Sequence, residues 1–158
     1  MRTIRIAGVT PNDVINGEGV SVSVWLQGCP HRCKGCHNPE TWNFEGGILY
    51  NQDMLTFEIL KLIEKNGIKR NLSILGGEPL CEQNIELVKE ILLAVKTAYP
   101  HIKVFLWTGY ELEDIKDTLI LEKVDVLITG PYIEEQRDIT LPLRGSYNQK
   151  VLRKEIDF

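Results

Sequence analysis

The sequence predicts an α/β fold, and within that class a curved, incomplete parallel (β/α) barrel of about five or six units. Short runs rich in branched and aromatic residues alternate along the chain with segments whose apolar residues recur at helical spacing. This alternation is typical of parallel strands joined by right-handed crossovers. The chain has 158 residues, whereas a complete eightfold barrel typically needs about 250. We therefore expect one domain over residues 1–158 whose barrel does not close.

The strands are expected where branched and aromatic residues concentrate. They are placed at residues 3–9, 20–26, 72–75, 104–107 and 124–128, with a further short strand near Val151. The helices are expected where apolar residues recur every three or four positions, at residues 52–66, 83 or 84–98 and 111–121. Residues 11–19 and 43–50 are rich in turn formers and are expected to be connections.

Composition limits the classes of function. Apolar residues make up 43% of the chain and charged residues 25%, which is ordinary for a globular protein. The net charge of -4 argues against a general nucleic-acid binder. No run approaches the roughly 18 apolar residues of a membrane span, and residues 1–9 lack a secretory pattern. We therefore expect a cytoplasmic protein with reduced cysteines and with neither nucleic acid nor membrane as a partner.

Three of the four cysteines, Cys29, Cys33 and Cys36, lie within one stretch of eight residues. Disulfides between such close neighbours would be strained and would leave one sulfur over. Soft thiolates instead favour zinc, copper(I) or an iron-sulfur cluster. Three cysteines would leave one iron of a 4Fe-4S cube free for a substrate. Gly35 lets this loop turn tightly and approach a ligand closely.

A structural zinc site remains the alternative, because zinc could take Cys81 or a histidine as its fourth ligand. Cys81 follows a Gly-Gly-Glu-Pro segment and is more simply interpreted as a buried free thiol. His31 and His37 flank the cysteines and are expected to be solvated or bonded to the main chain.

Two further segments follow expected strands, at the rim where α/β sheets bind ligands. In residues 76–79 the glycines Gly76 and Gly77 would let the main chain reach a ligand, although an ordinary strand-to-helix turn explains them as well. In residues 107–110 we expect Trp107 to be a core aromatic residue, and Thr108 and Tyr110 are candidates for lining the cavity.

The C-x3-C-x2-C spacing resembles the cluster motif of the radical S-adenosylmethionine superfamily. Other segments resemble one family within it, the anaerobic ribonucleoside-triphosphate reductase-activating proteins, which are activases of a glycyl-radical enzyme. These segments are residues 16–19, 36–42, 76–79, 107–110 and 144–149. The resemblance spans nearly the whole chain and implies the incomplete barrel of the radical S-adenosylmethionine type.

The resemblance also implies the cofactors. A 4Fe-4S cluster would be held by Cys29, Cys33 and Cys36. S-adenosylmethionine would contact Gly35, Cys36, His37, Gly76, Gly77 and Glu78. Within that set, the 76–79 segment would hold the methionyl ammonium group, with Glu78 supplying negative charge, and the ring of His37 would pack on the adenine. No catalytic residue is implied beyond the cluster and the cofactor.

The implied reaction is reductive cleavage of S-adenosylmethionine, after which the deoxyadenosyl radical takes a hydrogen atom from a glycine of the reductase. The implied partners are the large subunit of anaerobic ribonucleoside-triphosphate reductase and a flavodoxin-like or other low-potential electron donor. Residues 144–149 would form the mouth of the site or the surface that docks the reductase.

Three alternatives stay open at this point. The chain could activate another glycyl-radical enzyme such as pyruvate formate-lyase, or it could be a small radical S-adenosylmethionine enzyme of deazapurine synthesis. It could also be a zinc or electron-transfer module without enzymatic activity. Residues 107–110 and 144–149 favour the reductase activator, and the lack of a clear fourth ligand argues against the zinc module.

Overall fold

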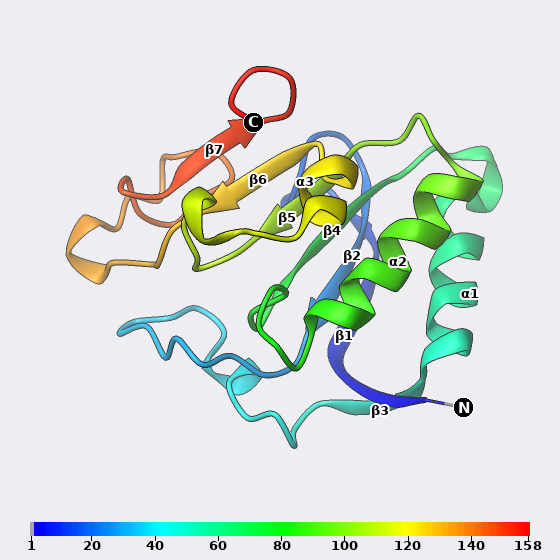
Figure 1. Cartoon of the computed structure of the whole chain (residues 1–158), viewed down its shortest axis with the longest axis horizontal. Helices are drawn as coiled ribbons and strands as arrows, with labels where there is room; N and C mark the ends of the chain where they lie inside the picture. Colours follow the sequence, from blue (N-terminus) through cyan, green and yellow to red (C-terminus); the bar gives the residue numbers. More distant parts are fainter. Residues whose placement is uncertain (1) are drawn as a thin grey trace.

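A computed structural model of the chain describes residues 2–158 (Figure 1). Its strands form one seven-stranded sheet in the order β3-β1-β2-β4-β5-β6-β7. They are β1 (Thr3–Asp13), β2 (Ser21–Leu26), β3 (Ile48–Asn51), β4 (Asn71–Gly76), β5 (Val104–Trp107), β6 (Val126–Thr129) and β7 (Lys150–Arg153). The α-helices are α1 (Gln52–Ile63), α2 (Ile85–Ala98) and α3 (Thr118–Lys123). The predicted α/β class is confirmed.

The sheet is mixed and open, so the expectation of five or six parallel units is wrong. Within residues 2–158, only β2, β4, β5 and β6 are parallel neighbours, while β1, β3 and β7 pair antiparallel at the two sides of the sheet. The cause is local: residues 14–20 between β1 and β2 are too few for a parallel crossover, which needs about a dozen residues or more. The first two strands therefore form a hairpin.

The three α-helices cover one face of the sheet (Figure 1). Alternate residues of the parallel strands, such as Val24, Ile74 and Leu106, are fully buried in the main apolar cluster with residues of the helices. The opposite face carries a smaller cluster of Phe105, Val126 and Ile128, with loops packed over it. The candidate site lies on this second face. No helix within residues 2–158 has the length and apolar character needed to cross a membrane.

Both expected connections at the start of the chain contain strand. β1 runs on to Asp13 through Pro11, which is tolerated because the pairing with β2 shifts register between Thr10 and Asp13. The connection at residues 43–50 ends in β3, a short edge strand that is only partly buried. The strand predicted over residues 3–9 is confirmed, but neither its continuation to Asp13 nor β3 alternates strongly enough to be predicted.

The predicted helix over residues 111–121 is also wrong. A single 3₁₀ turn at Leu112–Asp114 comes first, and α3 begins only at Thr118. The Asp117 carboxylate accepts hydrogen bonds from the main-chain N–H groups of Leu119 (3.0 Å) and Ile120 (3.3 Å), which fixes this start. The first helix ends at Ile63, before Asn66 adopts a φ of 59°.

Candidate functional site

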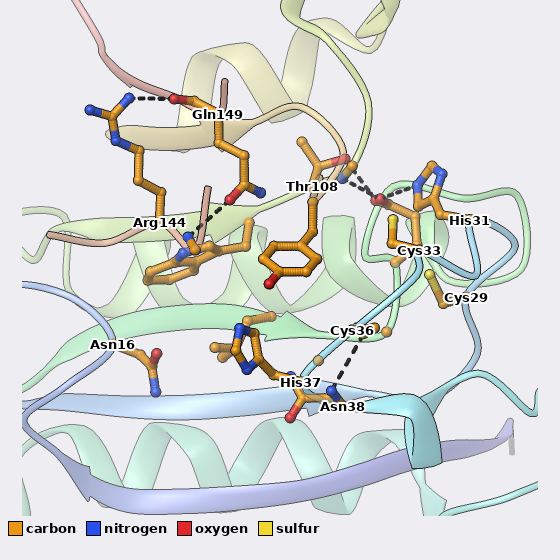
Figure 2. A pocket seen from close by; sticks show the side chains of 18 of the residues that line it. Asn16, Cys29, His31, Cys33, Cys36, His37, Asn38, Thr108, Arg144 and Gln149 are labelled. Carbon is orange, nitrogen blue, oxygen red and sulfur yellow. Dashed lines mark hydrogen bonds and ion pairs between the residues drawn. The ribbon is translucent and has the colours of Figure 1, made fainter. Parts of the chain in front are cut away.

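A pocket of about 460 Å³ opens where the carboxyl ends of the parallel strands meet (Figure 2). Its wall comes from the cysteine loop and from the residues at the ends of β4, β5 and β6. Cys29, Cys33 and Cys36 lie beside one another at one end of the pocket, and Arg144 and Gln149 lie at the other. The structure therefore brings together motifs that are far apart in the sequence.

The cysteine loop is closed at its base by main-chain hydrogen bonds. Gly28 N–H donates to Thr41 O (2.6 Å), and Cys29 N–H donates to Trp42 O (3.2 Å). Near the third cysteine, Cys36 N–H donates to Cys33 O (3.1 Å) and Asn38 N–H donates to the Cys36 sulfur (3.4 Å). These bonds hold the loop whose three cysteines line the pocket.

The donor set fits an iron-sulfur cluster. All three thiols are free and half-buried, and soft sulfur is the ligand that such clusters use. Burial raises the pKa of the Cys29 thiol, and the N–H groups of His31 and Arg32 oppose this only in part. No group of three His, Cys, Asp or Glu side chains within residues 2–158 is arranged to hold a single metal ion.

Cys81 lies apart from the other three thiols. It is 3% exposed, does not line the pocket, and its thiol donates to Glu78 O (3.2 Å). The prediction of a buried free thiol is confirmed.

The Gly76-Gly77 turn lies directly against the end of β2. A Cβ atom on Gly77 would lie 2.3 Å from Gly28 O, and one on Gly76 would lie 2.7 Å from Leu26 N. Gly76 also has a φ of 102°, which favours glycine. Because neither residue has a side chain, the main chain of this turn borders the pocket.

The carboxylate of Glu78 is 1% exposed and accepts four hydrogen bonds. Oε1 accepts from His31 Nε2 (2.6 Å) and Gly109 N–H (2.7 Å), and Oε2 accepts from Leu80 N–H (2.8 Å) and the Thr108 hydroxyl (2.8 Å). Sequence reasoning missed these bonds, since three of the four partners are distant in the chain.

The remaining predicted residues divide between the pocket and its surroundings. His37 lines the pocket, and its ring lies edge-on to Tyr132 at a centroid distance of 5.2 Å. Gly35 has a φ of 75° and packs against the Glu134 side chain, outside the pocket wall. Thr108 lines the pocket, whereas Tyr110 does not.

Trp107 has two roles. Its ring packs against the apolar cluster around Phe105, as predicted for a core aromatic residue, and it also borders the pocket. Its indole N–H donates to Leu143 O (2.6 Å). This bond ties the end of β5 to the segment that precedes residues 144–149.

Three residues of the 144–149 segment, Arg144, Gly145 and Gln149, line the pocket. Gln149 Oε1 accepts from Gly145 N–H (2.9 Å) and Ser146 N–H (3.1 Å), and its amide donates to Gly130 O (3.1 Å). Arg144 Nη1 donates to Gln149 O. The polar residues of this motif thus fix their own loop beside the end of β6.

Several pocket residues were not predicted as site residues. Asn16 and Trp42 belong to segments that carry the family resemblance, and this was the signal that could have identified them as site residues. Tyr132 and Leu141 lie in a segment without periodicity, which offered no such signal. Within residues 2–158 the Trp42 indole N–H and the Tyr132 hydroxyl are buried without a hydrogen-bond partner. Both residues border the pocket.

Comparison with known proteins identifies the family. The family described as "4Fe-4S single cluster domain" matches residues 15–152. The anaerobic ribonucleoside-triphosphate reductase-activating protein of Haemophilus influenzae is 39% identical over 90% of this chain and 94% of its own length. Proteins of the same name from Enterobacteria phage T4 and Escherichia coli K12 are 38% and 31% identical over 90% and 89% of this chain, covering 90% and 93% of their own lengths. The chain therefore belongs to the family of anaerobic ribonucleoside-triphosphate reductase-activating proteins.

Proposed function

We propose that this chain activates an anaerobic ribonucleoside-triphosphate reductase by generating a glycyl radical on its large subunit. The observation that carries the proposal is the position of three free thiols beside the bare main chain of Gly76 and Gly77, in one pocket. The names of the relatives support the choice of the reductase as the partner.

Cys29, Cys33 and Cys36 would hold a 4Fe-4S cluster, and the remaining iron would bind S-adenosylmethionine. Reduced, such a cluster would supply the one electron for reductive cleavage of S-adenosylmethionine, the chemistry that would remove a hydrogen atom from the α-carbon of the reductase glycine and release methionine and 5′-deoxyadenosine. The chain itself binds, orients and shields these groups.

The other site residues have distinct roles in this proposal. Main-chain groups of Gly76 and Gly77 would bind the methionyl end of S-adenosylmethionine, close to Cys36. His37 would border the adenosyl end, while Gly35 and Glu78 would act through the shape of the loop and the turn. Residues 144–149 would form the mouth through which the reductase segment enters.

The wider setting follows from the same proposal. Residues 1–158 would act as a single domain, and the open mixed sheet would be the partial barrel of the radical S-adenosylmethionine type. An open pocket suits a substrate that is a main-chain segment of another protein. The protein would work in the cytoplasm with a flavodoxin-like or other low-potential electron donor.

The test begins with anaerobic reconstitution with iron and sulfide, followed by iron and sulfide analysis and an absorption spectrum. The reduced protein, S-adenosylmethionine and the reductase are then mixed, and we expect a glycyl radical by electron paramagnetic resonance, together with methionine. Stoichiometric zinc in anaerobically purified protein, or no radical on a competent reductase, would contradict the proposal. A radical formed on pyruvate formate-lyase instead would assign the other activase function.

A further inference from the structure

His31 lies between two of the cysteines, and its ring is seated against the ends of β4 and β5. Its Nε2 lies 2.6 Å from Glu78 Oε1, and its ring lies edge-on to Tyr110 at a centroid distance of 4.7 Å. A Cβ atom on Gly109 would lie 2.7 Å from a carbon of the ring. The ring therefore fits only because residue 109 has no side chain.

Glu78 is the centre of this contact. Its carboxylate joins the cysteine loop, through His31, to the main chain at Leu80 and to the end of β5, through Thr108 and Gly109. With the Nε2–H tautomer of His31, all four contacts are donated to the Glu78 carboxylate, which has about four lone-pair sites. The four donors occupy all four sites, which leaves none for the ammonium group of a ligand.

We propose that His31 and Glu78 are positioning residues that form a latch between the cysteine loop and the Gly76-Gly77 turn. The resemblance to the family implies that Glu78 supplies negative charge to the methionyl ammonium group. In the latch Glu78 has a different role, because its carboxylate holds the two halves of the site at a fixed separation. This inference rests on the proposed function, since one half would hold the cluster and the other S-adenosylmethionine.

The separation matters because S-adenosylmethionine would have to reach the iron and the turn at the same time. The base of the cysteine loop is fixed by the bonds of Gly28 and Cys29, and His31 fixes a point between Cys29 and Cys33. Releasing the latch would let the cluster shift relative to the turn while the three cysteines still hold it.

Four variants test the latch. His31→Ala removes the ring, whereas His31→Gln keeps an N–H donor of similar reach. Gly109→Ala displaces the ring without removing any hydrogen-bonding group. Gly8→Ala is the matched control, because a Cβ atom there would meet nothing within 4 Å.

Each variant is reconstituted with iron and sulfide, and S-adenosylmethionine is titrated while the electron paramagnetic resonance spectrum of the reduced cluster is recorded. We expect wild-type iron content in all four variants. Affinity for S-adenosylmethionine should fall about 10- to 100-fold in His31→Ala and Gly109→Ala, as for other groups that orient a metal site. His31→Gln and Gly8→Ala should stay close to the wild type.

A double variant separates the latch from direct ligand binding by Glu78. If Glu78 and His31 act together, the double variant His31→Ala/Glu78→Gln should bind S-adenosylmethionine no more weakly than the weaker-binding of the two single variants. Additive losses would show that the two side chains act independently and would overturn the latch. Wild-type affinity in both His31→Ala and Gly109→Ala would also overturn it.

Thermal melts accompany each measurement. If His31→Ala fails to fold, Gly109→Ala and His31→Gln decide the question, because they keep the hydrogen-bonding groups. A wild-type protein that holds a complete cluster but gives no response to S-adenosylmethionine would overturn the proposed function itself, and the latch with it. Failure of the latch alone is therefore distinguishable from failure of the proposed function.

Discussion

The environment of each sulfur separates the four cysteines. Cys29, Cys33 and Cys36 are half-buried and face a pocket, where a cluster could displace their protons. Cys81 is 3% exposed, lies outside the pocket wall and donates its thiol hydrogen to Glu78 O, so it is not placed among the thiols that line the pocket. The same residue type therefore occurs in two settings, with three thiols lining the pocket and one buried in the core.

Replacing Cys33 and Cys81 in turn tests this division. Cys33→Ala should abolish cluster binding and the reductive cleavage of S-adenosylmethionine, because only two thiols would remain at the pocket. Cys81→Ala should retain both properties and lose about 1 kcal/mol of stability from a small cavity. Iron analysis and methionine formation measure the first effect, and urea unfolding measures the second. Full activity in Cys33→Ala would refute the assignment.

Gly77 is constrained by the main chain of Gly28, just beyond the end of β2, which cannot move as a side chain can. Gly77→Ala should push the turn away from Gly28, because the new Cβ atom would lie 2.3 Å from its carbonyl oxygen. We expect a loss of about 1–3 kcal/mol in the free energy of unfolding and weaker binding of S-adenosylmethionine. Gly8→Ala serves as the control, and equal results for the two variants would rule out the close contact as the cause.

The elements whose type is specified by their local sequence pattern were the ones predicted well. The apolar spacing of α2 and the buried runs of β4, β5 and β6 specify their type locally, and the structure has them close to the predicted bounds. β3 and the end of β1 exist because a neighbouring strand pairs with them, which no local pattern encodes. The candidate site divides in the same way: the cysteines were found from their spacing, but the partners of Glu78 depend on tertiary contacts.

The start of α3 depends on one side chain. Asp117 caps the helix and also lies 3.0 Å from Lys89 Nζ of α2. Asp117→Ala should lower the free energy of unfolding by about 1–2 kcal/mol, because the cap and the ion pair are lost together. Glu122→Ala, at an exposed position of the same helix, should change stability little.

The effect of Asp117→Ala should depend on pH. Burial would raise the pKa of Asp117, but the bonds from Lys89 and from the helix N–H groups outweigh it and hold the pKa below its ordinary value of 3.8. The contribution of a carboxyl with a lowered pKa is present above its unfolded pKa and is lost as the pH falls through the folded pKa. Urea unfolding at pH 7 and at about pH 3 should therefore show a smaller difference from the wild type at the lower pH. An unchanged difference would contradict the linkage.

At the scale of the whole molecule, the two ends of the parallel strands have different roles. The carboxyl ends of β2, β4, β5 and β6 lead into the cysteine loop, the Gly76-Gly77 turn, Thr108 and Gly130, and all four segments border the pocket. The amino ends lie at the opposite edge, where buried polar contacts join helix to sheet. Changes at that edge should affect stability without affecting the chemistry of the site.

Arg70, just before the amino end of β4, is the sharpest test of this separation. It is 4% exposed, and its guanidinium donates to Asn12 Oδ1 (2.8 Å) and to the carbonyl oxygens of Leu62 (2.9 Å), Lys65 (2.9 Å) and Ile68 (3.1 Å). Arg70→Met should lower the free energy of unfolding by about 2–4 kcal/mol, because it removes several charged hydrogen bonds made by a buried side chain. At temperatures well below its melting point, the reconstituted variant should keep the wild-type cluster spectrum and the wild-type affinity for S-adenosylmethionine. A changed spectrum in a folded Arg70→Met protein would show that the two edges of the sheet are coupled, since no contact of Arg70 reaches the pocket wall.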